Sequence, residues 1–290
     1  MVVASSLSER EASLACYYDR LTRWAALARL AGHGHGVATL TTHRALFDAT
    51  SGRTSVEHLH GRIAGALRPP PQPRGLDAGC GLGGTMLDLH RRFGGDWLGI
   101  TLSPAQARRG EAAARRRGVA ASCRFALASY DAPPAGPFDV VVAVESLAHS
   151  DTPAASVAAL ARRLAPGGTL LVVDDMPEPG ARHDADFHAF AAGWQTPRPL
   201  ERLGYAAVFA ATGLVVEHES DLTALLRPRR EAAIARLERL AGMTAALPLP
   251  ALRAVLDSHR GGLALERLYR RGLMRYVLLA ARREGYAKLA

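Results

Sequence analysis

A glycine-rich segment preceded by one carboxylate carries the strongest chemical signal in the sequence. Residues 76–84 read Leu-Asp-Ala-Gly-Cys-Gly-Leu-Gly-Gly, so Asp77 stands shortly before Gly79 and Gly81. Glycines let the backbone turn tightly and approach a ligand closely. The spacing Gly-x-Gly-x-x-Gly alone is a weak sign of dinucleotide binding, and Asp77 would repel a phosphate. The segment therefore favours a ligand that carries a cationic group.

Further reactive side chains follow two apolar runs later in the chain. Glu145 and His149 lie past the end of one run, and Asp174 and Asp175 end the other. An imidazole with an ordinary pKa near 6.5 suits a general base, and a carboxylate can stabilise a developing cation. Each group also has a structural interpretation: a hydrogen-bonded loop histidine, a structural glutamate, and an aspartate pair that starts a loop.

Parallel strands are needed to bring these side chains to one edge of a sheet. The proline-rich residues 68–75 form the clearest break in the chain, because proline blocks helix continuation. After the break, short apolar runs alternate with amphipathic stretches, which is typical of a doubly wound α/β sheet with helices on both faces. We expect strands at 75–79, 97–102, 123–128, 138–146, 169–175, 214–222 and 275–283. We expect helices between them at 85–93, 104–117, 152–165 and 199–212.

Helical segments are also expected outside this alternation. Residues 8–31 have apolar positions at helical spacing and stop at a glycine-rich run, and 53–67 form a second helical stretch. Residues 176–188 are polar and indicate a loop, whereas 228–272 are helical and rich in arginine. The expected organisation is a helical cap over 1–67, a core over 68–225 and 273–290, and a helical lid inserted over 226–272.

Composition excludes several classes of protein. The 290 residues are 48% hydrophobic and 22% charged, which is ordinary for a globular chain of one or two domains. The three cysteines are few and show no Cys-x-x-Cys spacing, which indicates a reduced cytoplasmic protein without a disulfide framework or a zinc site. We also expect no export signal and no membrane span. The formal net charge is +9, and the arginines that cause it are spread through the chain. This excess of arginine reflects either a GC-rich genome or a positive electrostatic field that attracts an anionic substrate. No nucleic-acid-binding motif accompanies it.

A second turn narrows the interpretation. Residues 164–170, Leu-Ala-Pro-Gly-Gly-Thr-Leu, lead into an apolar run, and together with the segment after Asp77 they resemble class I S-adenosylmethionine-dependent methyltransferases. Residues 99–106 and 144–150, with Tyr-Tyr-Asp at 17–19, resemble the sterol and tocopherol C-methyltransferase branch and the natural-product sugar O-methyltransferases of the rebeccamycin type. Two departures are Val37 in place of an aromatic residue and Ala148 in place of a first histidine.

The resemblance implies a Rossmann-like fold with a seven-stranded, mostly parallel sheet, and it implies roles for individual residues. The implied cofactor residues are Asp77, Gly79 and Gly81 at the amino-acid end, Thr101, Leu102 and Gln106 near the ribose, Ser129 and Tyr130 at the adenine, one of Tyr17 and Tyr18 at the carboxylate, and Glu145. The implied catalytic residues are His149, Glu145 and Asp175, and the implied substrate residues are His35, Trp194 and Arg198. Helix-core packing for the two tyrosines, a solvated position for Gln106 and core packing for Trp194 stay open.

The expected function is methyl transfer from S-adenosyl-L-methionine to carbon or oxygen of a small specialised metabolite in natural-product biosynthesis. One alternative is C-methylation of a prenyl diphosphate with Mg²⁺. Another, from a different class, is a protein that binds the cofactor without transferring a methyl group, or an isomerase. We expect a small-molecule acceptor as partner, no nucleic acid, no resident metal, and a homodimer as one possible assembly.

Overall fold

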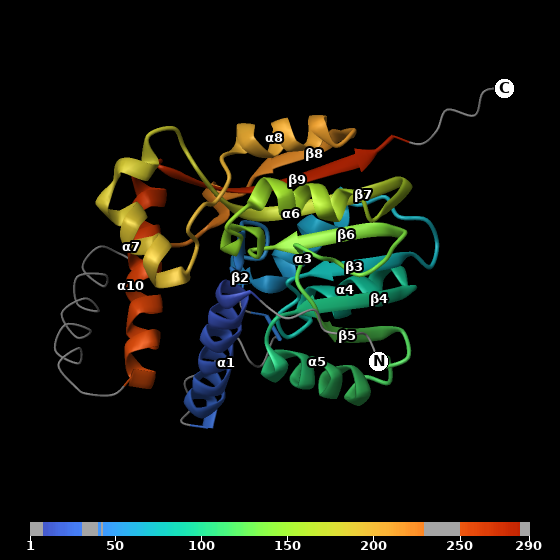
Figure 1. Cartoon of the computed structure of the whole chain (residues 1–290), viewed down its shortest axis with the longest axis horizontal. Coiled ribbons are helices and arrows are strands. Elements are labelled where there is room, and N and C mark those ends of the chain that lie inside the picture. Colours follow the sequence, from blue (N-terminus) through green and yellow to red (C-terminus); the bar gives the residue numbers. More distant parts are fainter. Residues whose placement is uncertain (1–7, 31–39, 42, 229–249, 285–290) are drawn as a thin grey trace.

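The computed structural model describes residues 8–30, 40–41, 43–228 and 250–284, with side chains from 23–30 and 250–255 left out. A seven-stranded sheet forms the centre, in the order β5-β4-β3-β6-β7-β9-β8, and only β9 runs antiparallel to its neighbours (Figure 1). Its strands are β3 (Arg74–Ala78), β4 (Asp96–Thr101), β5 (Cys123–Leu127), β6 (Phe138–Val144), β7 (Leu164–Pro177), β8 (Leu214–Asp221) and β9 (Met274–Arg283). This arrangement confirms the predicted Rossmann-like fold.

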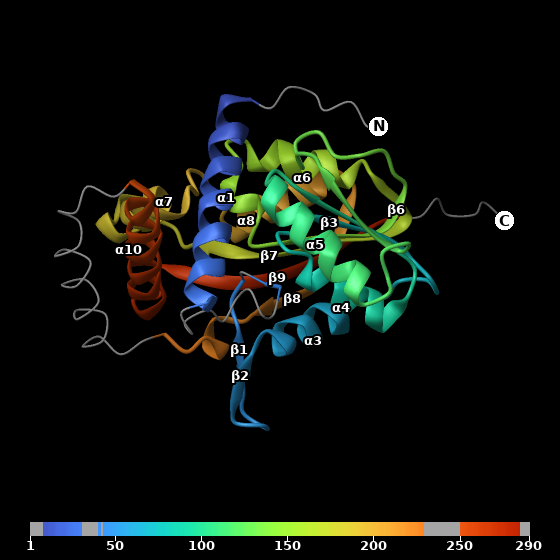
Figure 2. The ribbon, with the colours of Figure 1, turned by 90° about the horizontal axis from the view of Figure 1, so that it is seen from below.

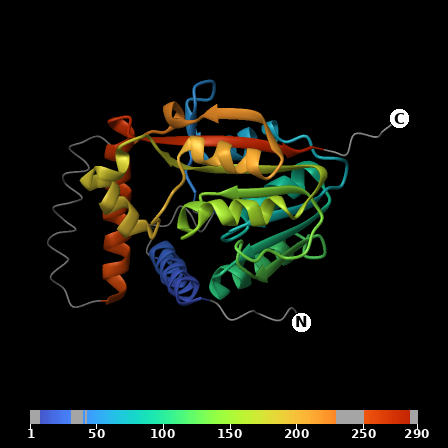
Figure 3. The ribbon, with the colours of Figure 1, turned by 45° about the horizontal axis from the view of Figure 1, so that its top comes forward.

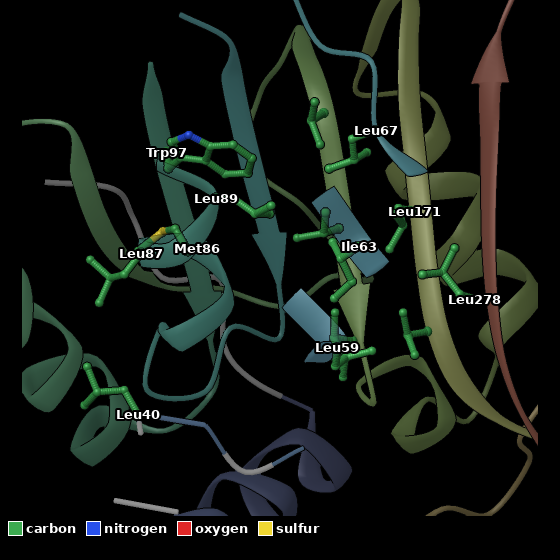
Figure 4. Packing of buried hydrophobic residues seen from close by; sticks show 14 of the residues in the cluster. Leu40, Leu59, Ile63, Leu67, Met86, Leu87, Leu89, Trp97, Leu171 and Leu278 are labelled. Atoms are coloured by element: carbon green, nitrogen blue, oxygen red, sulfur yellow. The ribbon is translucent and has the colours of Figure 1, made fainter. Parts of the chain in front are cut away.

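Helices cover both faces of the sheet because β6 and the centre of β7 are apolar on both sides. On one face lie α3 (Val56–Ala66), α4 (Gly84–Phe93) and α5 (Pro104–Arg116). Figure 4 shows Leu59 and Ile63 from α3 with Met86 and Leu89 from α4 in this cluster. On the other face, α6 (Pro153–Ala161) and α8 (Arg202–Ala211) pack on the alternate residues of the same strands (Figure 3).

Three further helices lie at the carboxyl end of the parallel strands. The helix α1 (Glu9–Leu30) contacts α5 on one side and α10 (Pro250–Arg270) on the other, as Figure 2 shows. The helix α7 (Ala185–Trp194) packs closely on α10, where a Cβ on Gly193 would lie 2.3 Å from the carbonyl oxygen of Asp257. Of these helices, α1 belongs to the segment expected as a cap and α10 to the segment expected as a lid, whereas α7 belongs to the expected core; the roles of cap and lid stay predictions.

The predicted elements differ from the structure at two places in the described ranges. The expected loop 176–188 is wrong in part, because β7 continues to Pro177 and α7 begins at Ala185, where the Asp184 side chain accepts a hydrogen bond from the Asp186 backbone. The expected helix 53–67 begins instead with a strand, since β2 (Arg53–Ser55) pairs with β1 (Leu46–Asp48). Of the expected helical region 228–272, residues 229–249 lie outside the described part. No helix in the described ranges is long and apolar enough to cross a membrane.

Candidate active site

The glycine-rich turn lies at the carboxyl end of β3, where parallel sheets bind ligands. Gly79 has a φ of +85°, and a Cβ there would lie 2.5 Å from the Cβ of Ser146, so this position requires glycine. The backbone N–H groups of Gly79 and Cys80 both donate to the carbonyl of Ile100, at 3.0 and 2.9 Å. The turn is thereby fixed to the end of β4.

Asp77 lies beneath this turn and has 2% of its surface exposed. Burial raises the pKa of its carboxyl to about 7, although a backbone hydrogen bond from Met86 acts in the opposite direction. Its Oδ2 atom is buried and has no hydrogen-bond partner among the described residues. Because a buried carboxylate oxygen without a partner is costly, Asp77 suits a ligand that supplies a cationic N–H donor.

A cavity of about 550 Å³, counted with its open mouth, lies between the turn, the end of β4, the segment after β6 and α1. Most of the predicted cofactor residues line it: Tyr18, Gly79, Gly81, Thr101, Leu102, Gln106, Tyr130, Glu145 and the predicted base His149. The wall is completed by Leu14, Ile100, Ser103, Ala128, Val144 and Ser146.

The end of β4 presents a hydroxyl and an amide in place of an acid. The Thr101 hydroxyl donates to Gln106 Oε1 at 2.8 Å, and both side chains are buried. Ser103 caps α5 by accepting from the Gln106 backbone at 3.1 Å, and its hydroxyl donates to Asp19 of α1. Asp19 also accepts from the Ala105 backbone at 3.2 Å, so α1 is anchored at this wall of the cavity.

His149 is held between two helices outside the core. Its Nδ1 lies 3.1 Å from the carbonyl oxygen of Gln195, which can only accept, so Nδ1 carries the proton and Nε2 accepts from the Tyr18 hydroxyl. Burial lowers the pKa of His149 to about 4. The imidazole is therefore neutral at pH 7, and its ordinary value near 6.5, assumed from the sequence, does not apply.

Glu145 follows β6 and has a φ of +49°, a left-handed conformation that is uncommon for a residue other than glycine. Its Oε1 accepts hydrogen bonds from the Arg44 backbone and from the Tyr276 hydroxyl, both at 2.8 Å, and lies 3.1 Å from Arg44 Nη1. Burial alone would raise the pKa of Glu145, but the charge of Arg44 lowers it below its usual value. This carboxyl is therefore ionised beside the cavity.

The two aspartates of β7 have different partners. Asp175 Oδ2 forms an ion pair with Arg44 Nη2 at 2.7 Å, and its Oδ1 accepts from the Tyr269 hydroxyl. Asp174 Oδ2 accepts from the Ala148 backbone at 3.0 Å and from Tyr205 at 3.4 Å. Burial raises the pKa of Asp174 to about 8, and the neighbouring Asp175 adds to this effect. Neither aspartate forms a hydrogen bond with His149, whose described partners are Tyr18 and Gln195.

A second cavity lies beside the first, between α1, α10 and the segments around Arg44 and Leu226. Its volume is about 1,070 Å³, counted with its open mouth. The lining combines the apolar side chains Leu21, Leu226 and Leu265, the aromatic Trp194 and Tyr269, and the cationic Arg44 and Arg227. Arg44 lines this second cavity and is ion-paired with Glu145, which lines the first cavity. The two cavities therefore meet at this pair of side chains.

Several predicted residues lie elsewhere. The Tyr17 hydroxyl donates to the Gly193 carbonyl at 3.1 Å and does not line the first cavity; Tyr18 does. Ser129 lines a neighbouring groove along β5, and Arg198 is exposed. Trp194 lines the second cavity and donates to the Ser258 carbonyl at 2.8 Å. His35 lies outside the described residues. In the described ranges, no group of three His, Cys, Asp or Glu could hold a metal ion.

Arg44 and its neighbours Tyr269 and Tyr276 are the main residues that the sequence analysis missed. Arg44 is separated from Glu145 by 101 positions and from Asp175 by 131. No local motif marks it, and the chain contains 36 lysines and arginines among which it does not stand out. The one available signal was a tyrosine, Tyr276, in a strand that was expected to be buried.

Comparison with known proteins identifies the domain. Residues 76–168 match the family model described as a methyltransferase domain. A probable chloroplastic tocopherol O-methyltransferase from Oryza sativa subsp. japonica is 39% identical over 100 residues, which are 34% of this chain and 28% of that protein. The chain thus matches less than a third of that relative's length. These similarities confirm the resemblance to class I methyltransferases that the sequence predicts.

Solved structures support the fold across nearly the whole chain. A geranyl diphosphate methyltransferase in complex with geranyl diphosphate and sinefungin superimposes with a TM-score of 0.71 at 23% identity, covering 96% of this chain and 100% of that one. The [4+2]-cyclase SpnF gives a TM-score of 0.72 at 20% identity, covering 94% and 95%. The chain therefore shares the Rossmann-like fold of these proteins over nearly its whole length, and residues 76–168 are similar to a methyltransferase domain.

Proposed function

We propose that the protein is an S-adenosyl-L-methionine-dependent methyltransferase that acts on a small molecule in natural-product biosynthesis. The observation that carries the proposal is the cavity at the strand ends, which is lined by the glycine turn. Asp77 does not itself line this cavity; it is buried, two residues before Gly79 of the turn. The cofactor carries an ammonium group and a sulfonium group, and both positive charges suit a site with the carboxyl groups of Asp77 and Glu145 better than a phosphate would. The unpaired Oδ2 of Asp77 supports the fit, because an ammonium N–H would satisfy it.

The residues around the cavity divide into groups by position. Asp77 and the Gly79 turn would hold the amino-acid end, and Thr101 with Gln106 would bind the ribose hydroxyls in place of an acid. Tyr130 and Leu102 would flank the adenine, and Tyr18 would close the cavity from α1. When bound, the cofactor supplies an electrophilic methyl group. The chain itself aligns the acceptor and excludes water, which can account for much of the rate.

The second cavity is the proposed acceptor site. Its apolar and aromatic walls suit a hydrophobic or flat molecule. For a hydroxyl acceptor, His149 would take the proton through Tyr18, because the Tyr18 hydroxyl already lies against Nε2. For a carbon acceptor, the ionised Glu145 would stabilise the cation that forms. Asp175 would act through Arg44 in either case.

A prenyl diphosphate is a second candidate acceptor. It is favoured by the same cavity, which joins apolar Leu21, Leu226 and Leu265 to the guanidinium of Arg227. Arg44 is already paired with Glu145 and Asp175, and Glu266 also lines this cavity. Dependence of activity on Mg²⁺ would separate it from a neutral metabolite. A protein that binds the cofactor without transferring its methyl group would show cofactor binding but no methylated product with any acceptor.

Location, assembly and domain roles complete the proposal. The cysteines at 16, 80 and 123 are free, which supports a cytoplasmic location. The edge strand β8 exposes Val215 and Val216, which supports a homodimer that light scattering can test. We assign 1–67 as a cap, 226–272 as a lid, and 68–225 with 273–290 as the core.

The direct test is to incubate the protein with methyl-labelled S-adenosyl-L-methionine and a panel of phenols, hydroxylated sugars and prenyl diphosphates, with and without Mg²⁺. The proposal predicts label in one class of acceptor and none when Glu145→Gln and His149→Ala are combined. Cofactor binding without label in any acceptor would support the non-methylating alternative.

A further inference from the structure

Arg44 lies inside a cage of aromatic rings. Its guanidinium carbon is 5.1 Å from the ring centre of Trp194, 5.1 Å from that of Tyr276 and 5.6 Å from that of Tyr269. The rings come from α7 and from the consecutive elements α10 and β9, and all of them are far from Arg44 in the sequence. Aromatic faces around a cation are the arrangement by which proteins bind quaternary ammonium and guanidinium ligands.

Two carboxylates complete the cage. Asp175 Oδ2 lies 2.7 Å from Nη2, and Glu145 Oε1 lies 3.1 Å from Nη1. Among the described residues, the donors to Glu145 all address Oε1, and none addresses Oε2. Since Glu145 lines the first cavity and Arg44 the second, the cage stands between the proposed cofactor and acceptor sites.

We propose that Arg44 is the resident cation of a cation-binding cage, and that it determines the charge class of the acceptor. While the guanidinium fills the cage, a cationic acceptor finds neither free rings nor a free carboxylate there. The acceptor is therefore a neutral or anionic molecule. Arg44 also acts as a positioning residue, because it holds Glu145 by Oε1 and leaves Oε2 for the cofactor side. Only the assignment of the second cavity to the acceptor rests on the proposed function.

The cage itself can be tested without any methyl transfer. Arg44→Ala removes the guanidinium and should leave a site for methylguanidinium, measured by calorimetry and by the change in Trp194 fluorescence. We expect binding at least about tenfold tighter than that of the neutral isostere methylurea, since charge and ring faces both contribute. Wild-type protein should not bind either probe. Arg202→Ala is the matched control, because Arg202 pairs with Glu219 on the surface, where no ring surrounds it.

A second variant separates the charge from the loss of a side chain. Arg44→Lys keeps a cation in the cage and should bind methylguanidinium no better than wild-type protein does. Equal binding of methylguanidinium and methylurea to Arg44→Ala, or equal binding to Arg44→Ala and Arg202→Ala, would overturn the cage. If Arg44→Ala does not fold by itself, refolding it with methylguanidinium should recover folded protein, whereas refolding it with methylurea should not; equal recovery with both probes would overturn the cage.

Two further measurements test the consequences. Methylguanidinium should restore cofactor affinity to Arg44→Ala, because it again fixes Glu145; Arg44→Ala with unchanged cofactor affinity would overturn the positioning role. If wild-type protein methylates an acceptor that carries a positively charged group, Arg44 does not determine the charge class of the acceptor. Failure of wild-type protein to bind the cofactor would contradict the proposed function, whereas the methylguanidinium result would stand by itself.

Discussion

The Tyr18 hydroxyl lies 2.5 Å from His149 Nε2, although the two residues are 131 positions apart. The contact joins α1 to the segment after β6, and the Gln195 carbonyl at 3.1 Å holds the other ring nitrogen. A proton from an acceptor would therefore reach His149 through the hydroxyl of Tyr18 in α1. Docking of α1 and the chemistry of the site are thereby coupled.

The first prediction concerns this pair. With a hydroxyl acceptor, His149→Ala and Tyr18→Phe should each lower kcat by about 10²-fold or more and change cofactor affinity little. Because the pKa of His149 is lowered to about 4, kcat at saturating cofactor should be flat from pH 6 to 8 and should fall only as the pH drops through about 4. Tyr17→Phe is the control, since its hydroxyl bonds to Gly193 outside the cavity. A rate that rises through pH 6–7 would argue against His149 as the base.

The second prediction concerns acid stability and uses His60, which lies outside the site. Burial and the neighbouring His43 lower the pKa of His60 to about 4. The unfolded chain therefore binds more protons between about pH 6.5 and 4, so the stability contributed by neutral His60 is complete above that window and is lost on acidification. Asp77 and Asp174, whose pKa values are raised, act in the opposite direction, so the net slope of wild-type protein is not diagnostic.

The informative quantity is the difference in unfolding free energy between wild-type protein and His60→Asn. It should shrink by a few kcal/mol as the pH falls from 6.5 to 4, at roughly 1.4 kcal/mol for each unit of pKa shift. Urea titrations at several pH values measure it. A difference that stays constant with pH would show that His60 titrates normally.

The third prediction separates two costs at the glycine turn. Gly79→Ala has two costs: an alanine in a left-handed backbone conformation, and a Cβ 2.5 Å from the Cβ of Ser146. Gly213→Ala has only the backbone cost, because φ is +71° there and no atom lies within 4 Å of the added Cβ. We expect Gly213→Ala to destabilise by about 1 kcal/mol and Gly79→Ala by clearly more, with loss of cofactor binding. Thermal unfolding of both variants measures the difference; equal melting temperatures would contradict the close approach.

The sequence predicted the core well because its signals are local. The unbroken apolar run of β6 indicates a strand buried on both faces, and the Ser103–Pro104 start of α5 is a standard helix N-terminus. The Gly79 turn could likewise be placed at the cavity from its position at a strand end, whereas Thr101 and Gln106 were placed there by the resemblance to methyltransferases.

The remaining features depend on contacts between distant segments. The cage around Arg44 combines rings from α7, α10 and β9 with carboxylates from β7 and from the residue after β6, and no spacing along the chain indicates it. The choice between Tyr17 and Tyr18 depends on how α1 rotates against α7, which a helical pattern alone does not fix. The lowered pKa of His149 arises from burial in the folded chain. The ordinary pKa of an exposed histidine, which the sequence analysis assumed, therefore did not predict it.

The central claim is that S-adenosyl-L-methionine binds in the first cavity against Asp77. Calorimetric titration of the cofactor into wild-type protein and Asp77→Asn, from pH 5.5 to 8.5, tests it most directly. Because the pKa of Asp77 is raised to about 7 by burial, the carboxyl must ionise to receive the ammonium group. We predict one site whose affinity increases as the pH rises through about 7, and weaker, pH-independent binding to Asp77→Asn. Absence of binding at every pH, or identical curves for the two proteins, would contradict the account.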